Sequence, residues 1–508
     1  MKKRTIASIQ TVALHGFSGV PVRVETDIRA GLPSLQIVGM GNKAIDEARQ
    51  RVRSAILNSS LQFPSQKVII NLAPAELPKD GAHFDLPIAI SILRASNQLT
   101  ERQTREVAFI GELSLNGDLL PVRGAILFAE AAKEAGATKL FVPVESYAQA
   151  TLVKGVEIIA TTSLKEAFQC LRGVHTPSPP HPEPAPPASS SAPLLTFNSI
   201  TGHETTKRAL TLAVAGHHNI LLHGPPGSGK THLAKAATGL LPPLTPQEVI
   251  EVTKLHSLAG ITDSLITNPP LRSPHHSVTR TAFIGGGSHP RPGDISLAHR
   301  GILLLDELPE YPRATLEALR QPLEDRRITL SRLYGSITFP ADMLLIATMN
   351  PCPCGFYQDS ERTCRCSMGQ IAAYTKKLSG PLLDRIDLHV SVPRTTDEYY
   401  FDTKPLTKNQ QQTGAEMVLN IRRIQKLRYK SSVYYNGNAS PEVIKKYFKV
   451  EQAAHALVQN AQKNLGLSGR GALHTLRVAR TIADAAQSST VKAEHVAEAL
   501  QFRSALHV

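Results

Sequence analysis

One stretch of the chain combines glycines, a lysine and a threonine at the spacing of a phosphate-binding loop. It reads Gly224-Pro225-Pro226-Gly227-Ser228-Gly229-Lys230-Thr231 and fits the pattern G-x-x-x-x-G-K-[ST]. Glycines let backbone N–H groups close around phosphates, Lys230 brings a positive charge to them, and Thr231 offers a hydroxyl to Mg²⁺. A chance glycine-rich turn is the plainer interpretation. The flanks argue against it, because residues 217–223 are typical of a buried strand and residues 232–237 of the helix that should follow.

A second string, Leu303-Leu304-Leu305-Asp306-Glu307, is an apolar strand that ends in two carboxylates. We expect Asp306 to hold the magnesium ion and Glu307 to polarise the attacking water. Alone, this pair would indicate only an ordinary acidic strand end. After a phosphate-binding loop it supplies what the loop lacks, so the two strings together predict hydrolysis of ATP with Mg²⁺.

Composition narrows the class of protein. The 508 residues are enough for roughly three domains, and 42% of them are apolar, which is enough for packed cores. No apolar run approaches the ~18 residues needed to cross a bilayer, and five cysteines without an export signal favour a reducing cytoplasm. A net charge of +14 favours a polyanionic partner such as DNA, although a generically basic surface is an alternative. With no tryptophan, DNA contacts should be to phosphate and therefore sequence-independent.

A proline- and serine-rich stretch, residues 173–195, should be an extended linker, because it cannot build a core. It separates an N-terminal α+β module, residues 1–172, from an α/β ATPase core, residues 196–400, with alternating strands and helices. Residues 401–508 are expected to form a helical lid. Within the first module the patterns predict strands over 22–26 and 68–72 and helices over 42–57, 86–93 and 129–135.

Four of the five cysteines are clustered in two short strings, Cys352-Pro353-Cys354 and Cys364-Arg365-Cys366. Four thiolates suit tetrahedral Zn²⁺, but the C-x-C spacing is tighter than the usual C-x₂₋₄-C. A set of free thiols on a loop is the alternative. Any zinc here should be structural, because four protein ligands leave no open position for chemistry.

Further motifs resemble one family. They are residues 349–355, 378–388 and 296–301 in the ATPase core, and 30–33, 71–75 and 84–89 in the N-terminal module. Together they resemble the ComM/YifB family of magnesium-chelatase-like AAA+ proteins over nearly the whole chain apart from the linker. The resemblance implies a homo-oligomeric ring, usually a hexamer, with ATP sites between subunits.

The resemblance also assigns roles to three residues. Asn350 matches the sensor-1 position, and Arg385 matches the arginine finger that reaches the neighbouring subunit's γ-phosphate. Arg470 is the best match to sensor 2, with Arg477 and Arg480 as alternatives. In each case a structural salt-bridge arginine is the simpler interpretation.

Two other segments could contact DNA. The insert over 272–293 is glycine-rich, and in related ATPases an insert here carries a hairpin facing the pore; His289 and Arg291 could then touch phosphates. A surface loop is equally compatible. Residues 416–430 read as a basic amphipathic helix, for which a solvated face is the commoner meaning.

The N-terminal module resembles the Lon protease domain (a ribosomal protein S5 domain 2-like fold) in residues 79–85 and 119–124. In that family a Ser–Lys dyad does the chemistry. Here His83 stands where the serine would fall and Ile126 where the lysine would be, so nucleophile and base are both absent. We expect a Lon-like fold without peptidase activity.

The leading hypothesis is an ATP-driven DNA translocase or helicase. The resemblance associates it with branch migration in homologous recombination and with the integration of transforming DNA in competent cells. A second hypothesis is a chelatase-like or chaperone-like motor that remodels a protein partner. An ATP-dependent protease is disfavoured by the missing dyad.

Overall fold

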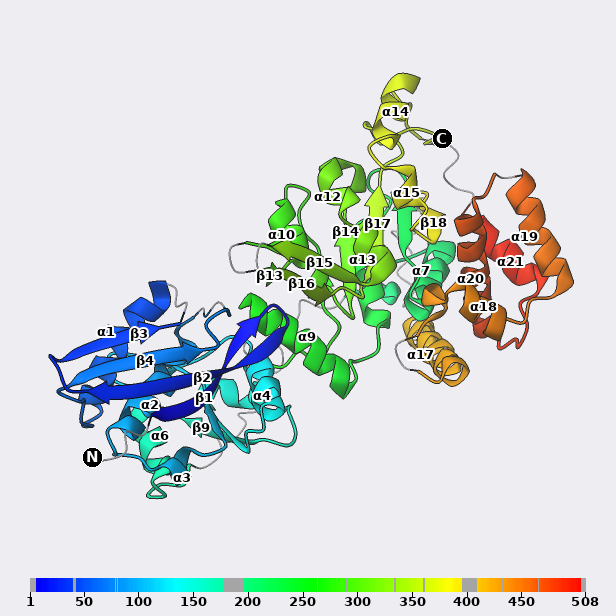
Figure 1. Ribbon diagram of the computed structural model, residues 1–508. Helices are drawn as coiled ribbons and strands as arrows, with labels where there is room; N and C mark the ends of the chain where they lie inside the picture. Colours follow the sequence, from blue (N-terminus) through cyan, green and yellow to red (C-terminus); the bar gives the residue numbers. More distant parts are fainter. Residues whose placement is uncertain are drawn as a thin grey trace. The chain divides into compact units, whose positions relative to one another are not determined.

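The computed structural model describes residues 6–39, 43–77, 79, 81–177, 195–262, 264–287, 290–332, 335–359, 361–394, 409–431, 434–464 and 466–503. These residues pack into two compact units (Figure 1). Unit 1 contains the residues before the linker together with 246–266 and 330–339, and unit 2 contains the rest of the ATPase segment and the C-terminal helices. Most of the predicted linker lies outside the described residues.

Unit 1 is built on a mixed sheet of seven strands in the order β3-β4-β2-β1-β5-β8-β9. The strands are β1 Ala7–His15, β2 Ser18–Arg29, β3 Ser34–Val38, β4 Lys67–Ala73, β5 Val107–Phe109, β8 Lys139–Pro143 and β9 Glu157–Thr161. β1, β2 and β4 are antiparallel neighbours, whereas β1, β5, β8 and β9 run parallel. A small hairpin joins β6 Glu112–Leu113 to β7 Leu119–Leu120.

Helices cover both faces of this sheet, because successive strand residues point to opposite sides. In β1, Ile9 and Ala13 enter the core under α1, α2 and α6, whereas Val12 enters the core under α4. The helices are α1 Lys43–Asn58, α2 Asp85–Ala95, α3 Glu101–Thr104, α4 Ala125–Glu134, α5 Tyr147–Ala150 and α6 Leu164–Leu171.

Two pieces of the ATPase segment belong to unit 1. The helix α9 Pro246–Ala259 is held there by Ser257, whose hydroxyl accepts from Gly124 N at 2.9 Å and donates to Gln149 Oε1 at 2.8 Å. The second piece comes from the hairpin of β15 Arg327–Arg332 and β16 Gly335–Pro340. Its Ile337 and Phe339 pack with Leu255 of α9 and with Phe17.

Unit 2 contains an all-parallel sheet of five strands in the order β11-β14-β17-β10-β18 (Figure 1). The strands are β10 Ile220–His223, β11 Leu271–Arg272, β14 Ile302–Leu305, β17 Leu344–Met349 and β18 Leu388–Ser391. The four residues of β14 and the six of β17 are all buried, as expected for a parallel sheet covered on both faces.

Helices surround this sheet and continue into the C-terminal segment. The helices of the core are α7 Glu204–Gly216, α8 Lys230–Ala236, α10 Arg280–Ile284, α11 Asp294–Leu297, α12 Arg313–Glu317, α13 Arg320–Asp325, α14 Met368–Thr375 and α15 Gly380–Leu383. Short strands β12 Gly285–Gly286 and β13 Arg291–Pro292 pair as a hairpin. The C-terminal helices are α17 Asn409–Tyr429, α18 Pro441–Tyr447, α19 Gln452–Asn464, α20 Gly469–Ala485 and α21 Ala493–Gln501.

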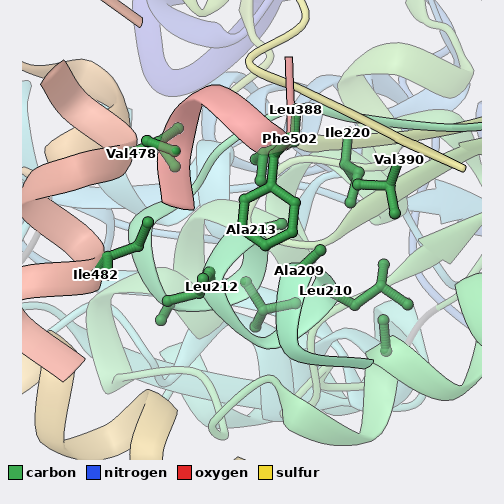
Figure 2. Packing of buried hydrophobic residues seen from close by; sticks show 14 of the residues in the cluster. Ala209, Leu210, Leu212, Ala213, Ile220, Leu388, Val390, Val478, Ile482 and Phe502 are labelled. Carbon is green, nitrogen blue, oxygen red and sulfur yellow. The ribbon is translucent and has the colours of Figure 1, made fainter. Parts of the chain in front are cut away.

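One hydrophobic core joins the sheet of unit 2 to the C-terminal helices. Figure 2 shows Val478 and Ile482 of α20 and the ring of Phe502 beside residues of α7, β10 and β18. All of these side chains are buried. The C-terminal helices are therefore packed onto the ATPase core.

The predicted elements are present. Strands 22–26 and 68–72 lie within β2 and β4, and helices 42–57, 86–93 and 129–135 correspond to α1, α2 and α4. The mixed and parallel sheets match the predicted α+β and α/β classes, and the segment 409–503 is helical as expected. No helix within the described ranges is long and apolar enough to span a membrane.

Candidate nucleotide-binding site

Three adjacent strands of unit 2 end at the same edge of the sheet, and the predicted site residues follow them. β10 ends before the phosphate-binding loop, β14 ends before Asp306, and β17 ends before Asn350. The strands are parallel neighbours, so these ends meet. The carboxyl edge of an open parallel sheet is where such folds bind ligands.

The phosphate-binding loop requires its glycines. A Cβ on Gly224 would lie 2.1 Å from the carbonyl oxygen of Val392, which no side chain can do. Gly227 and Gly229 have φ angles of 77° and 78°, a region that favours glycine. The loop therefore has a backbone conformation that side chains would disturb, and it leads directly into α8, an arrangement suited to phosphate.

Lys230 lies inside this loop. Its Nζ donates to the carbonyl oxygens of Gly224 at 2.8 Å and Pro225 at 2.7 Å, and to Asn350 Oδ1 at 3.3 Å. Burial lowers the pKa of Lys230 to about 8, a shift that the nearby Asp306 carboxylate opposes. Phosphate oxygens are stronger acceptors for an ammonium than these neutral groups, so the lysine is placed to bind them.

The two predicted magnesium ligands are in contact. Thr231 Oγ1 donates to Asp306 Oδ1 at 3.0 Å. Thr348, on β17, also donates its hydroxyl to the Asp306 carboxylate. A hydroxyl and a carboxylate are the hard oxygen ligands that Mg²⁺ takes, so the residues present fit the ion. Thr348 was missed by sequence reasoning, although it lies only two residues before Asn350.

Glu307 follows Asp306 in a left-handed backbone conformation, with φ of 53°. Its N–H donates to Thr348 Oγ1 at 3.1 Å, so one threonine positions both acidic residues. This conformation is uncommon for a residue other than glycine and is maintained only where the surroundings impose it. The geometry brings Glu307 to the same strand edge as the phosphate-binding loop that contains Lys230.

Arg385 and Arg470 share one carboxylate away from the loop. Arg385, just after α15, forms an ion pair with Glu324 of α13, and its Nη1 donates to Pro381 O at 2.8 Å. Arg470, in the first turn of α20, donates to Glu324 Oε1 at 3.0 Å. Among the described residues, neither arginine has a hydrogen bond to the phosphate-binding loop. Glu324, which sequence reasoning did not single out, is thus the bridge between them.

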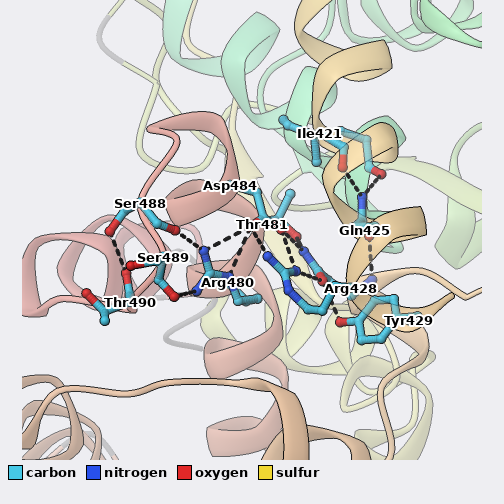
Figure 3. A network of polar contacts seen from close by, with 12 residues as sticks. Ile421, Gln425, Arg428, Tyr429, Arg480, Thr481, Asp484, Ser488, Ser489 and Thr490 are labelled. Carbon is cyan, nitrogen blue, oxygen red and sulfur yellow. Dashed lines mark hydrogen bonds and ion pairs between the residues drawn. The ribbon is translucent and has the colours of Figure 1, made fainter.

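Arg477 and Arg480, the alternatives to Arg470, form hydrogen bonds within the C-terminal helical segment. Arg480 is 1% exposed and donates to Asp484 at 2.9 Å (Figure 3). Arg428 of α17 pairs with the same carboxylate. Arg477 donates its Nε to Ala439 O at 2.8 Å. Arg480 is therefore the structural salt-bridge arginine of the simpler interpretation, because Asp484 and the carbonyls of Ser488 and Ser489 use its guanidinium.

The four clustered cysteines are brought together. All four sulfurs lie within 4.8 Å of one another, in the loop that follows Asn350. Backbone N–H groups, first that of Phe356, lower the pKa of the Cys354 thiol to about 6. The fifth cysteine, Cys170, lies in α6 of unit 1.

The two segments predicted to contact DNA differ in where their basic side chains lie. In the insert, the hairpin is present as β12 and β13, and Arg291 is exposed, whereas His289 lies outside the described residues. In α17, Arg422 donates to Val214 O at 3.0 Å, so with Arg428 it points inward, not to solvent. The exposed basic residues there are Arg423 and Lys426 of α17 and Lys430, which directly follows the helix.

The two positions compared with a protease dyad are buried in unit 1. His83 lies between the rings of Phe84 and Phe128, at centroid distances of 4.2 and 4.7 Å, with Nε2 3.0 Å from Val12 O. Burial lowers its pKa to about 4, so the ring is neutral. Ile126 is fully buried in the core under α4. The absence of peptidase activity stays a prediction.

The parallel sheet, the phosphate-binding loop and the acidic strand define a P-loop nucleotide hydrolase of the AAA+ class. Comparison with models of known protein families identifies the family within this class. Magnesium chelatase, subunit ChlI, matches residues 196–400; subunit ChlI of Mg-chelatase matches residues 24–146; and the ChlI C-terminal region matches residues 408–503.

Individual relatives match nearly from end to end. YifB of Escherichia coli is 40% identical over 98% of this chain and 97% of its own length. The competence protein ComM of Haemophilus influenzae is 38% identical over 98% of each chain. The chain therefore belongs to the ComM/YifB family of magnesium-chelatase-like AAA+ proteins. A partial similarity to Lon protease 2 of Bacillus subtilis, 29% identity over 32% of this chain, accompanies this match.

Proposed function

We propose that this chain is the subunit of an ATP-hydrolysing ring, a hexamer by analogy with its family, that moves along DNA. Phosphates would be bound by the loop and Lys230, with Mg²⁺ between Thr231 and Asp306. That ion would supply charge neutralisation at the β- and γ-phosphates. Glu307 would take the proton of the attacking water, and Asn350 would orient that water.

The positions of Arg385 and Arg470 are the observation that supports a ring-shaped assembly. A finger must reach a γ-phosphate, yet Arg385 and Arg470 bind Glu324 and not the loop of their own chain. Glu324 and Arg470 are 49% and 44% exposed, whereas Arg385 is 16% exposed, so Arg385 would reach a second copy only after its ion pair with Glu324 opens. We infer that both arginines complete the site of a neighbouring subunit, which makes each ATP site depend on two chains.

The DNA partner rests on two supports. The net charge of +14 attracts a polyanion, and exposed basic side chains on α17 and Arg291 of the hairpin offer phosphate contacts. The printed name of the Haemophilus relative refers to competence, and we extend that association to this chain. The role that fits both the basic charge and the association with competence is branch migration of recombination intermediates during integration of transforming DNA. Remodelling of a protein partner is the second candidate.

The test is ATP hydrolysis with and without forked DNA, with strand displacement followed in parallel. We expect stimulation by DNA and displacement, both abolished by Lys230→Ala. Lys235→Ala is the matched control, because Lys235 lies on the same helix but is exposed. DNA affinity should fall steeply with salt and be indifferent to sequence. Unstimulated hydrolysis without DNA retention at low salt would favour the protein-remodelling function.

A further inference from the structure

Three of the four clustered sulfurs have the separations of ligands around a single ion, and the fourth, Cys366 Sγ, lies within 4.8 Å of each of them. Cys352 Sγ lies 3.4 Å from Cys354 Sγ and 3.7 Å from Cys364 Sγ, and the latter two are 3.5 Å apart. A tetrahedral zinc ion with Zn–S bonds of about 2.3 Å holds its sulfurs roughly 3.8 Å apart. A disulfide would need about 2.05 Å. An iron–sulfur cluster divides its cysteines among two or more irons, so its four sulfurs could not all lie within 4.8 Å of one another.

Backbone N–H groups around the sulfurs suit an anionic tetrathiolate centre. Tyr357 N donates to Cys352 Sγ at 3.3 Å, and Cys366 N donates to Cys364 Sγ at 3.4 Å. Such N–H···S bonds orient thiolates and stabilise their charge. Arg394 ties the same loop down through a 2.9 Å ion pair with Asp359.

This cysteine loop, residues 352–366, touches the nucleotide site at two points. Cys352 is buried and follows Asn350 by two residues, so its position limits where the Asn350 side chain can lie. At the second point Gly355, with φ of 86°, lies against the phosphate-binding loop. A Cβ there would be 2.4 Å from Pro226 Cγ.

We propose that Cys352, Cys354, Cys364 and Cys366 bind Zn²⁺, and that the ion braces the nucleotide site from behind. With the ion bound, the cysteine loop holds Asn350 beside Lys230 and supports Pro226. Without it, the four thiols separate and both contacts loosen. Zinc thus has a positioning role in hydrolysis, with no open coordination position of its own. The metal site stands apart from the DNA function, and only its coupling to hydrolysis rests on the proposed ATPase.

The first experiment measures metal in the purified full-length chain by elemental analysis. We expect about one zinc ion per chain and its loss in Cys364→Ser. The control is Cys170→Ser, which removes the one cysteine outside the cluster and should keep the metal. Replacement by Co²⁺ should give the visible absorption of a tetrahedral thiolate site. Wild-type protein that holds no metal after purification with added zinc, with its four thiols freely titratable, would overturn the site.

The second experiment separates zinc binding from its proposed effect on the nucleotide site. Gly355→Ala should keep its zinc, but the added methyl group should push against Pro226 and weaken ATP binding. Cys364→Ser should lose zinc and lower kcat by about 10–100-fold, the usual effect of removing groups that support and orient a site from behind. Since Cys364→Ser could unfold, zinc is also stripped from the wild type by a chelator and then restored. We expect hydrolysis to fall and recover while circular dichroism stays constant.

Two results would contradict the brace. One is a zinc-free wild type with unchanged kcat and ATP affinity. The other is Gly355→Ala with retained zinc and wild-type ATP binding. Failure of the ATPase itself is distinguishable, because protein that bound zinc but showed no hydrolysis dependent on Lys230 would sink the proposed function and leave the metal site standing.

Discussion

At the scale of single residues, the site is assembled around one carboxylate and one ammonium. Asp306 receives hydroxyl hydrogen bonds from Thr231 and Thr348, which come from two different elements. Burial lowers the pKa of Lys230 to about 8, and Asn350 contacts it directly. These contacts define the site that we propose for phosphate and Mg²⁺, and the roles of neighbouring residues can be tested one at a time.

Glu307→Gln tests the proposed general base. The amide preserves the size of the side chain but cannot take a proton from water. We expect ATP to bind as in the wild type and kcat to fall by about 10²–10⁴-fold, the usual contribution of a general base. Equilibrium binding and single-turnover hydrolysis measure the two effects. A variant that hydrolyses ATP normally would assign the base elsewhere.

The pKa of Lys230 predicts a pH dependence of ATP binding. In the free protein this pKa is about 8, because burial disfavours the charged form. Phosphates favour the charged form, so binding raises the pKa and takes up a proton above pH 8. Affinity should therefore be constant well below pH 8 and weaken as pH rises through it. Titration calorimetry in buffers of different ionisation enthalpy detects the proton. Lys235→Ala should behave as the wild type, and a flat profile would contradict the assignment.

At the scale of elements, the C-terminal helices are joined to the core by apolar packing and to one another by buried charge. Asp484 of α20 pairs with Arg480 of its own helix and with Arg428 of α17 (Figure 3). The side-chain amide of Asn436 also donates to Asp484. The pairing with Asp484 explains why a helix with the charge pattern of a solvated basic face turns part of its charge inward. The charge pattern of α17 alone cannot reveal a carboxylate that lies far along the chain.

Asp484→Ala should therefore destabilise the helical segment strongly. It leaves two guanidinium groups buried without their carboxylate, which typically costs about 3–5 kcal/mol. Urea unfolding followed by circular dichroism measures this loss. Asp325→Ala, at an exposed position in α13, is the control and should change stability by no more than about 0.5 kcal/mol. Equal effects of the two substitutions would show that the network is not a stabilising element.

At the scale of the whole molecule, the sequence predicted what is local and missed what is not. The phosphate-binding loop and Asp306 were predicted because each directly follows an apolar strand, and Asn350 was predicted from the family resemblance; the structure brings all three to one edge of the sheet, and their roles stay predictions. Glu324 was not found, because its partners are 61 and 146 residues away. The packing of α9 and of β16 into unit 1 was also not predicted, since nothing in their own pattern names Gly124 or Phe17 as neighbours. The predicted ATPase core, residues 196–400, includes α9 and β16, and nothing in the sequence indicates that these two elements would pack elsewhere.

The Lon-like description of unit 1 and the lid role of the C-terminal helices stay predictions. The mixed sheet and the buried His83 and Ile126 agree with a fold that lacks a nucleophile and its base. A peptidase activity lost on mutating unit 1 would contradict that reading. Either way, two pieces of the segment that sequence analysis assigned to the ATPase core, residues 246–266 and 330–339, belong to unit 1.

The central claim is that ATP is hydrolysed between subunits, with Lys230 from one chain and Arg385 from the next. The most direct measurement mixes Lys230→Ala subunits with Arg385→Ala subunits. Each variant alone should be inactive, since loss of an arginine finger costs about 10³–10⁵ in rate where it has been measured. The mixture should regain DNA-stimulated hydrolysis at junctions that pair an intact loop with an intact arginine. A mixture as inactive as its components, or a wild type that hydrolyses ATP fully as a monomer, would contradict the account.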